Sequence, residues 1–134
     1  MKKKPPLWIV ERDVLAIHGC ILALHGGAPG LRDQGLLKSA LARPQQHLAY
    51  AHSPNVISMA SLYTAGIVRN HPFIDGNKRT GFVVGVLFLE LNGFKFTADE
   101  EGATQAVLGL AAGTIEEDAY ASWLQANSQR KRSK

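Results

Sequence analysis

Apolar positions recur every three or four residues along most of the chain, the spacing typical of helices with one buried face. A first helix is predicted from Glu11 to His25, and glycines and a proline then end it. Its apolar face consists of Val14, Ile17, Ile21 and Leu24. Asp33 is a suitable N-cap for a second, shorter helix that we expect to stop near Pro44. The segment Gln45 to Ser53 has no clear period, so an irregular or extended loop is predicted there.

The next two predicted helices flank a short polar segment. The first runs from an N-cap at Asn55 to position 70, and Pro72 is expected to give His71 an extended conformation. The second begins near Asn77 and ends at the turn residues 92–93. Large apolar residues surround this second helix almost completely, so we expect it in the middle of a bundle.

A brief extended piece is expected at Phe94 to Phe96, followed by two more helices. Each of these helices starts with a threonine and has a glutamate three residues later: Thr97 with Glu100, and Thr114 with Glu117. That spacing is the spacing of a capping box. The expected fold is therefore all-α, a compact single-domain bundle of about six helices over residues 1–134 with a central buried helix.

The basic charge is concentrated at the two ends of the chain. The formal net charge is +4, but seven of the 15 lysines and arginines lie in tails at about residues 1–6 and 128–134, which we expect to be disordered. The body between them is net acidic. A DNA-binding domain carries its basic stripe on a folded face, so we expect no specific DNA binding by this chain alone. Contact of the tails with RNA or an acidic partner is the alternative.

The remaining composition indicates a soluble protein of the cytoplasm, with no membrane segment. Cys20 is the only cysteine, which excludes an internal disulfide and fits a reducing compartment. No apolar run approaches the length of a membrane span. His18 and the other histidines outside the polar segment lack the spacing of paired metal ligands, so we interpret them as structural.

The chemistry is concentrated in residues 71–80, His-Pro-Phe-Ile-Asp-Gly-Asn-Lys-Arg-Thr. Free backbone N–H groups at the start of the following helix can hold an anion, and Gly76 permits the positive φ of a tight turn. Lys78 and Arg79 lie in the first helical turn, where the helix dipole disfavours each cation by about 0.3–1 kcal/mol. A phosphate group bound there would explain both.

Two further residues complete a possible phosphoryl-transfer site. Asp75 offers a hard oxygen ligand for Mg²⁺ shared with nucleotide phosphates, and His71 is a suitable general base. Phe73 is expected to anchor the loop in the core. The alternative is an ordinary helix–helix loop whose polar residues only cap and solvate.

This segment resembles the motif of the Fic family, His-Pro-Phe-x-x-Gly-Asn-Gly-Arg. The residues that match are His71, Pro72, Phe73, Gly76, Asn77 and Arg79. Lys78 stands where the second glycine would be, a departure shared with the death-on-curing (Doc) branch, whose pattern is similar to His-x-Phe-x-Asp-x-Asn-Lys-Arg-Thr. The upstream runs Gly30 to Asp33 and Leu36 to Pro44 also resemble that branch.

The resemblance implies the Fic fold and a toxin of a type II toxin–antitoxin pair. Such a toxin transfers the γ-phosphate of ATP to a threonine of a translation elongation factor similar to elongation factor Tu, and arrests translation. It implies that His71 is the base and that Asp75 holds Mg²⁺. The residues implied to bind the phosphates of ATP are Gly76, Asn77, Lys78 and Arg79. Two alternatives remain open, namely transfer of AMP to a protein hydroxyl and a catalytically silent binding module.

The resemblance also implies partners. A cognate, Phd-like antitoxin is expected to contribute a disordered segment that folds on the toxin. The segment Gln45 to Ser53 is a candidate for a flap that holds the target peptide, with an ordinary connector as the alternative. Thr97 to Gly102 also fits the family's inhibitory string Ser/Thr-x-x-x-Glu-Gly/Asn, with Glu101 at the acidic position, but we interpret it as a helix start.

Overall fold

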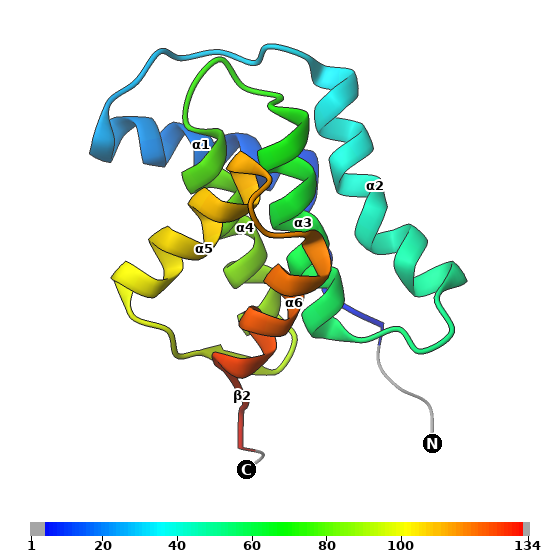
Figure 1. Cartoon of the computed structure of the whole chain (residues 1–134). Coiled ribbons are helices and arrows are strands. Elements are labelled where there is room, and N and C mark those ends of the chain that lie inside the picture. The colour runs from blue at the N-terminus through cyan, green and yellow to red at the C-terminus, as the bar shows by residue number, and fades with distance from the viewer. Residues whose placement is uncertain (1–4, 133–134) are drawn as a thin grey trace.

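The computed structural model describes residues 5–132, within which six helices pack together beside a small two-stranded sheet (Figure 1). The all-α bundle of about six helices expected from the sequence is confirmed. The elements are α1 (Glu11–His25), α2 (Gln34–Tyr50), α3 (Val56–Asn70), α4 (Asn77–Leu91), β1 (Phe94–Phe96), α5 (Glu100–Ala112), α6 (Glu117–Ala126) and β2 (Ser128–Arg130). None of the helices in the described residues is long and apolar enough to cross a membrane.

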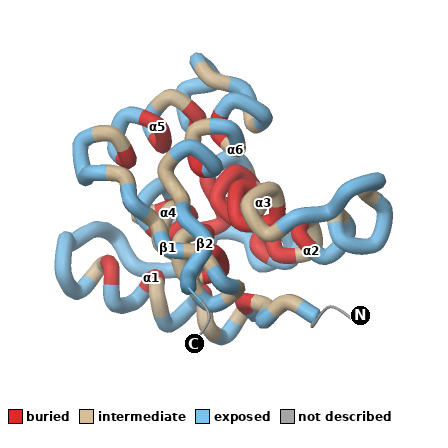
Figure 2. Tube along the Cα trace, turned by 90° about the horizontal axis from the view of Figure 1, so that it is seen from below, coloured by how far each residue is buried: buried red, intermediate tan, exposed pale blue. Residues whose placement is uncertain are grey.

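Helix α3 occupies the centre, with α2, α4, α5 and α6 packed around it (Figure 2). Almost every position from Met59 to Val68 is buried. Neighbouring helices approach closely where side chains are small, since a Cβ added at Gly66 would lie 3.0 Å from the Cβ of Ala40 in α2. The central position predicted for α4 therefore belongs to α3. Helix α4 turns small residues such as Gly81 toward α3 and keeps several larger apolar side chains partly exposed.

Helix α2 extends beyond the predicted end and contains Pro44 in its interior. Residues 45–50 are consequently helical, and the predicted loop is wrong over this stretch. A proline inside a helix removes one backbone hydrogen bond and costs about 3 kcal/mol. Because Pro44 is buried and α2 packs extensively on α3, tertiary packing overrides the local signal for a helix end.

The two predicted capping boxes are also wrong. Helix α5 starts at Glu100, and its N-cap is Asp99, whose side chain accepts a hydrogen bond from the N–H of Gly102. Thr97 lies before that cap, and its N–H donates to the carbonyl of Asn127 instead. Helix α6 starts at Glu117, and its N-cap is Glu116, two residues later than the predicted cap Thr114. Thr97 is thus paired with a distant residue, and Thr114 donates hydrogen bonds to the carbonyl of Gly109 in the turn that ends α5. Neither threonine is available as a helix cap.

The β1 strand forms where an extended piece was expected, but its partner lies in a predicted tail. Phe94 pairs with Arg130 and Phe96 with Ser128 in an antiparallel ladder. The guanidinium of Arg130 also lies 5.2 Å from the centre of the Phe94 ring. The expected disorder is therefore wrong for residues 128–130, because backbone pairing and this cation–π contact order them. Residues 1–4 and 133–134 of the predicted tails lie outside the described residues.

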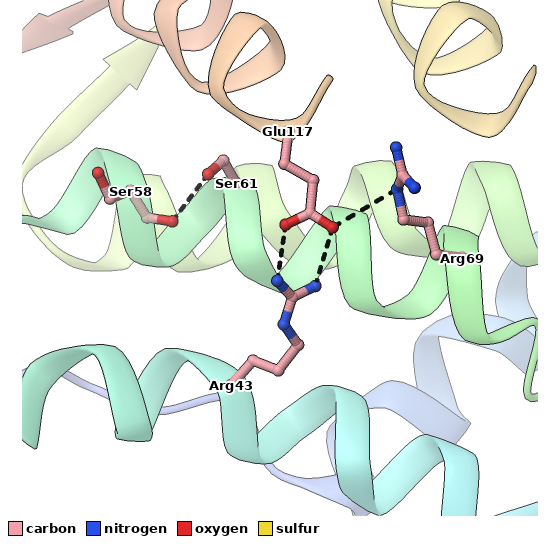
Figure 3. Close-up of polar contacts among 5 residues, drawn as sticks. All are labelled: Arg43, Ser58, Ser61, Arg69 and Glu117. Carbon is pink, nitrogen blue, oxygen red and sulfur yellow. Dashed lines mark hydrogen bonds and ion pairs between the residues drawn. The ribbon is translucent and has the colours of Figure 1, made fainter. Parts of the chain in front are cut away.

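Glu117 of α6 ties the middle of α2 to the C-terminal end of α3 (Figure 3). Its carboxylate accepts hydrogen bonds from both terminal nitrogens of Arg43 in α2, at 2.6 and 3.2 Å. The same carboxylate lies 3.5 Å from Nε of Arg69 in the last turn of α3. This ion network holds the end of α3 that leads directly into residues 71–80.

Candidate active site

His71 ends α3 in the left-handed region, with φ 54° and ψ 53°, and the extended conformation predicted from Pro72 is wrong. The guanidinium of Arg32 stabilises this turn by donating to the carbonyl oxygens of Asn70 and His71, at 2.9 and 2.6 Å. The N–H of His71 still donates to the carbonyl of Ile67 at 3.1 Å. The helix end is thus satisfied by a side chain from elsewhere in the chain, which outweighs the local preference before proline.

The buried side chain of Asn77 organises the loop between α3 and α4, and only 4% of the residue is exposed. Its Oδ1 accepts from the N–H of Phe73 at 2.9 Å, and its Nδ2 donates to the carbonyl of Phe73 at 2.9 Å and lies 3.1 Å from Nδ1 of His71. The two contacts with Phe73 fix the orientation of the amide, so Nδ1 of His71 is an acceptor and the neutral ring carries its hydrogen on Nε2. Since the side-chain amide of Asn77 is hydrogen-bonded to Phe73 and His71, the backbone N–H of Asn77 is the group left to face a ligand.

Asp75 is exposed, and its backbone is held by His18 of α1. Nε2 of His18 donates to the carbonyl of Asp75 at 2.8 Å, and the His18 ring stacks on Phe73 with 3.8 Å between ring centres. Both rings are buried. Sequence reasoning missed this role of His18. The signal available was its position between Val14 and Ile21, on the buried face of α1.

Helix α4 begins with an open N-terminus. Its N-cap, Gly76, has φ 81°, and no side chain caps the first turn. Lys78 and Arg79 are exposed there, and neither takes part in an ion pair within residues 5–132. Free N–H groups and two unpaired cations make this end of the helix strongly suited to an anion.

A cavity of about 720 Å³ lies in front of this terminus, within the usual size of a small-molecule site. Its polar end is lined by His71, Asp75, Gly76, Asn77, Lys78 and Arg79. Its other walls include apolar side chains of α4, β1 and α5, namely Phe82, Val83, Phe96, Ala103, Val107 and Leu108. The structure therefore brings the polar residues singled out in the sequence to one cavity that also has an apolar wall.

The donor set of the cavity restricts the kind of metal it suits. No group of three or more His, Cys, Asp or Glu side chains that could enclose a metal ion occurs in the described part of the chain. Asp75 would be a single carboxylate ligand. That arrangement fits Mg²⁺ shared with phosphates and water, which rarely relies on an all-protein cage.

The predicted flap is wrong, because most of Gln45 to Ser53 is helical and none of it lines the cavity. The segment that runs beside the motif is instead the connection between α1 and α2, residues 26–33, whose Leu31 pairs with Phe73 in an antiparallel bridge. Glu101, the acidic position of the inhibitory string, is exposed and does not line the cavity.

Comparison with known proteins identifies the family. The sequence model of the Fic/DOC family matches residues 8–89, more than half of the chain and all of the loop described above. The protein kinase Doc of Escherichia phage P1 is 31% identical over 116 residues, which is 87% of this chain and 91% of that protein. The toxin Doc of Mycolicibacterium smegmatis is 39% identical over 75 residues, 55% of this chain and 58% of that protein. This chain belongs to the Fic/DOC family.

Proposed function

We propose that this protein is the toxin of a toxin–antitoxin pair and a kinase that transfers the γ-phosphate of ATP to a threonine of a translation elongation factor similar to elongation factor Tu. The relatives named a protein kinase and a toxin support this class of activity. The single observation that carries the proposal is the α4 N-terminus, where Lys78 and Arg79, which form no ion pair within residues 5–132, line one cavity together with Asp75 and His71.

The polar residues at the α4 end of the cavity each have a role in this proposal. Lys78, Arg79 and the backbone N–H of Asn77 bind the phosphates at the turn formed by Gly76, and the apolar wall accepts the base of the nucleotide. Asp75 would hold Mg²⁺, which when bound neutralises phosphate charge. Lys78 favours phosphate transfer over AMP transfer, because it adds a cation where the Fic pattern has a glycine.

His71 handles the proton of the target hydroxyl. The threonine oxygen bonds to the γ-phosphorus, the bond from that phosphorus to the bridging oxygen breaks, and ADP leaves while the proton passes to the imidazole. The neutral ring carries its hydrogen on Nε2, so the proton is taken up at Nδ1 of His71. The side-chain N–H of Asn77 must then give up its contact with that nitrogen, because imidazolium carries hydrogen on both ring nitrogens. Positioning and charge stabilisation supply most of the catalysis in such a site.

The partner expected for such a toxin is a Phd-like antitoxin whose disordered segment folds on this chain. Production of the chain alone in the cytoplasm of a bacterial cell should arrest the growth of that cell. Production together with the antitoxin should not. The His71→Ala variant, made to the same level, should leave growth unaffected. Arrest by the variant as strong as by wild type would remove His71 from the activity.

The chemistry is tested with radiolabelled ATP added to a translation extract together with the purified chain. Label from the γ-phosphate should appear on one protein band, whereas label from the α-phosphate should not. Transfer of α-label would instead support AMP transfer. No transfer of either label, with growth arrest intact, would support a binding module.

A further inference from the structure

The carboxylate of Asp75 is held by two segments that are distant in sequence. Its Oδ1 accepts a hydrogen bond from the N–H of Gly76 at 2.8 Å, next to it in the chain. Its Oδ2 accepts from the N–H of Ala28 at 3.2 Å, and Ala28 lies 47 positions earlier. Each oxygen keeps lone-pair capacity for a cation, so these bonds orient the carboxylate without using it up.

Gly27 leaves the space that this carboxylate occupies. A Cβ added at Gly27 would lie 2.9 Å from Oδ2 of Asp75 and 3.3 Å from its Cγ. The same Cβ would lie 2.9 Å from Cδ2 of Leu22, so any other residue at position 27 would displace both the carboxylate and this leucine side chain. The preceding Gly26 also has a positive φ, 78° against 128° for Gly27, but a Cβ added there would meet nothing within 4 Å.

Backbone hydrogen bonds fix the segment that contains Gly27 and Ala28 to the motif loop. The N–H of Ile74 donates to the carbonyl of Gly30 at 3.1 Å. The N–H groups of Arg32 and Asp33 both donate to the carbonyl of Pro72, at 2.6 and 3.0 Å. The α1–α2 connection and the α3–α4 loop thus form one unit, and the position of the Ala28 N–H relative to α4 is set by it.

We infer that Gly27 and the backbone N–H of Ala28 are positioning elements for the Asp75 carboxylate, so that affinity for a magnesium–nucleotide complex depends on the α1–α2 connection. The inference rests on the proposed role of Asp75 toward Mg²⁺. Groups that orient a metal ligand by hydrogen bonding typically change metal affinity by about 10- to 100-fold when they are altered.

Calorimetric titration of the purified full chain with ATP tests this, once with Mg²⁺ and once with EDTA. We expect Gly27→Ala to weaken binding of Mg·ATP by about tenfold or more relative to Gly26→Ala. Binding of metal-free ATP should be equal in the two variants, because the cations of α4 are untouched. In an Asp75→Ala background, Gly27→Ala should have no further effect on Mg·ATP binding.

Amide NMR provides a second measurement that does not depend on how well Gly27→Ala folds. Asp75→Ala should shift the Ala28 signal strongly and leave that of Gly26, whose N–H donates to Leu22, in place. Equal Mg·ATP affinity of the two glycine variants, or an unmoved Ala28 signal, would overturn the inference while Asp75 could still bind the metal. If the affinity of the wild-type chain for ATP were the same with Mg²⁺ and with EDTA, the proposed role of Asp75 toward the metal would be overturned, and the inference with it.

Discussion

Replacing Asn77 by alanine should destabilise the protein more than any loss of a single surface hydrogen bond. The substitution leaves both the N–H and the carbonyl of Phe73 without their partner, and Phe73 is only 1% exposed. A buried polar group that loses its partner costs about 1–3 kcal/mol, so the two together should cost about 2–6 kcal/mol. The contact with His71 is lost as well.

Urea unfolding at 25 °C measures this free energy, with Asn127→Ala as the matched control. Asn127 donates one side-chain hydrogen bond, to the carbonyl of Trp123 at 2.8 Å, and lies away from the cavity. Its replacement should cost about 1 kcal/mol. If Asn77→Ala lost no more free energy of unfolding than Asn127→Ala, the assignment of Asn77 as the organiser of the loop would be refuted.

Two further predictions concern stability. Glu117→Gln should lower the free energy of unfolding by only about 0–1 kcal/mol in urea titrations, because its side chain and that of Arg43 are about one-third exposed to solvent; a loss above about 3 kcal/mol would contradict this. Burial raises the pKa of Tyr63 and of Tyr120 from 10.0 to about 12, so the folded state holds these protons more tightly and stability should fall as pH rises from 10 to 12. Unfolding measured over that range should depend less on pH when both tyrosines are phenylalanine, and an unchanged dependence would refute the prediction.

Local signals predicted most helix boundaries because the groups concerned are close in sequence. Asp33 and Asn55 were predicted as N-caps, and their side chains accept from the N–H groups of Leu36 and Ser58. The failures occur where distant contacts decide. Pro44 remains inside α2 because the helix packs on α3, and no local pattern carries that information.

The residues of the candidate site also fall into those that local sequence could predict and those that distant contacts place. The polar residues at its centre could be predicted because they belong to one loop and one helical turn, which any compact fold keeps together. The groups that hold this loop in place, His18, Gly27, Ala28 and Arg32, come from α1 and the connection after it. A positive φ at His71 likewise depends on Arg32, so only the folded chain reveals it.

The central proposal is that the residues of this cavity catalyse the transfer of phosphate from ATP to a protein hydroxyl. Intact-mass spectrometry of purified elongation factor Tu, incubated with the chain and Mg·ATP, tests it most directly. We predict a gain of one phosphoryl group on a single threonine, and no gain with the His71→Ala variant. A gain of an adenylyl group, or an unchanged mass with a chain that still arrests translation, would contradict the account.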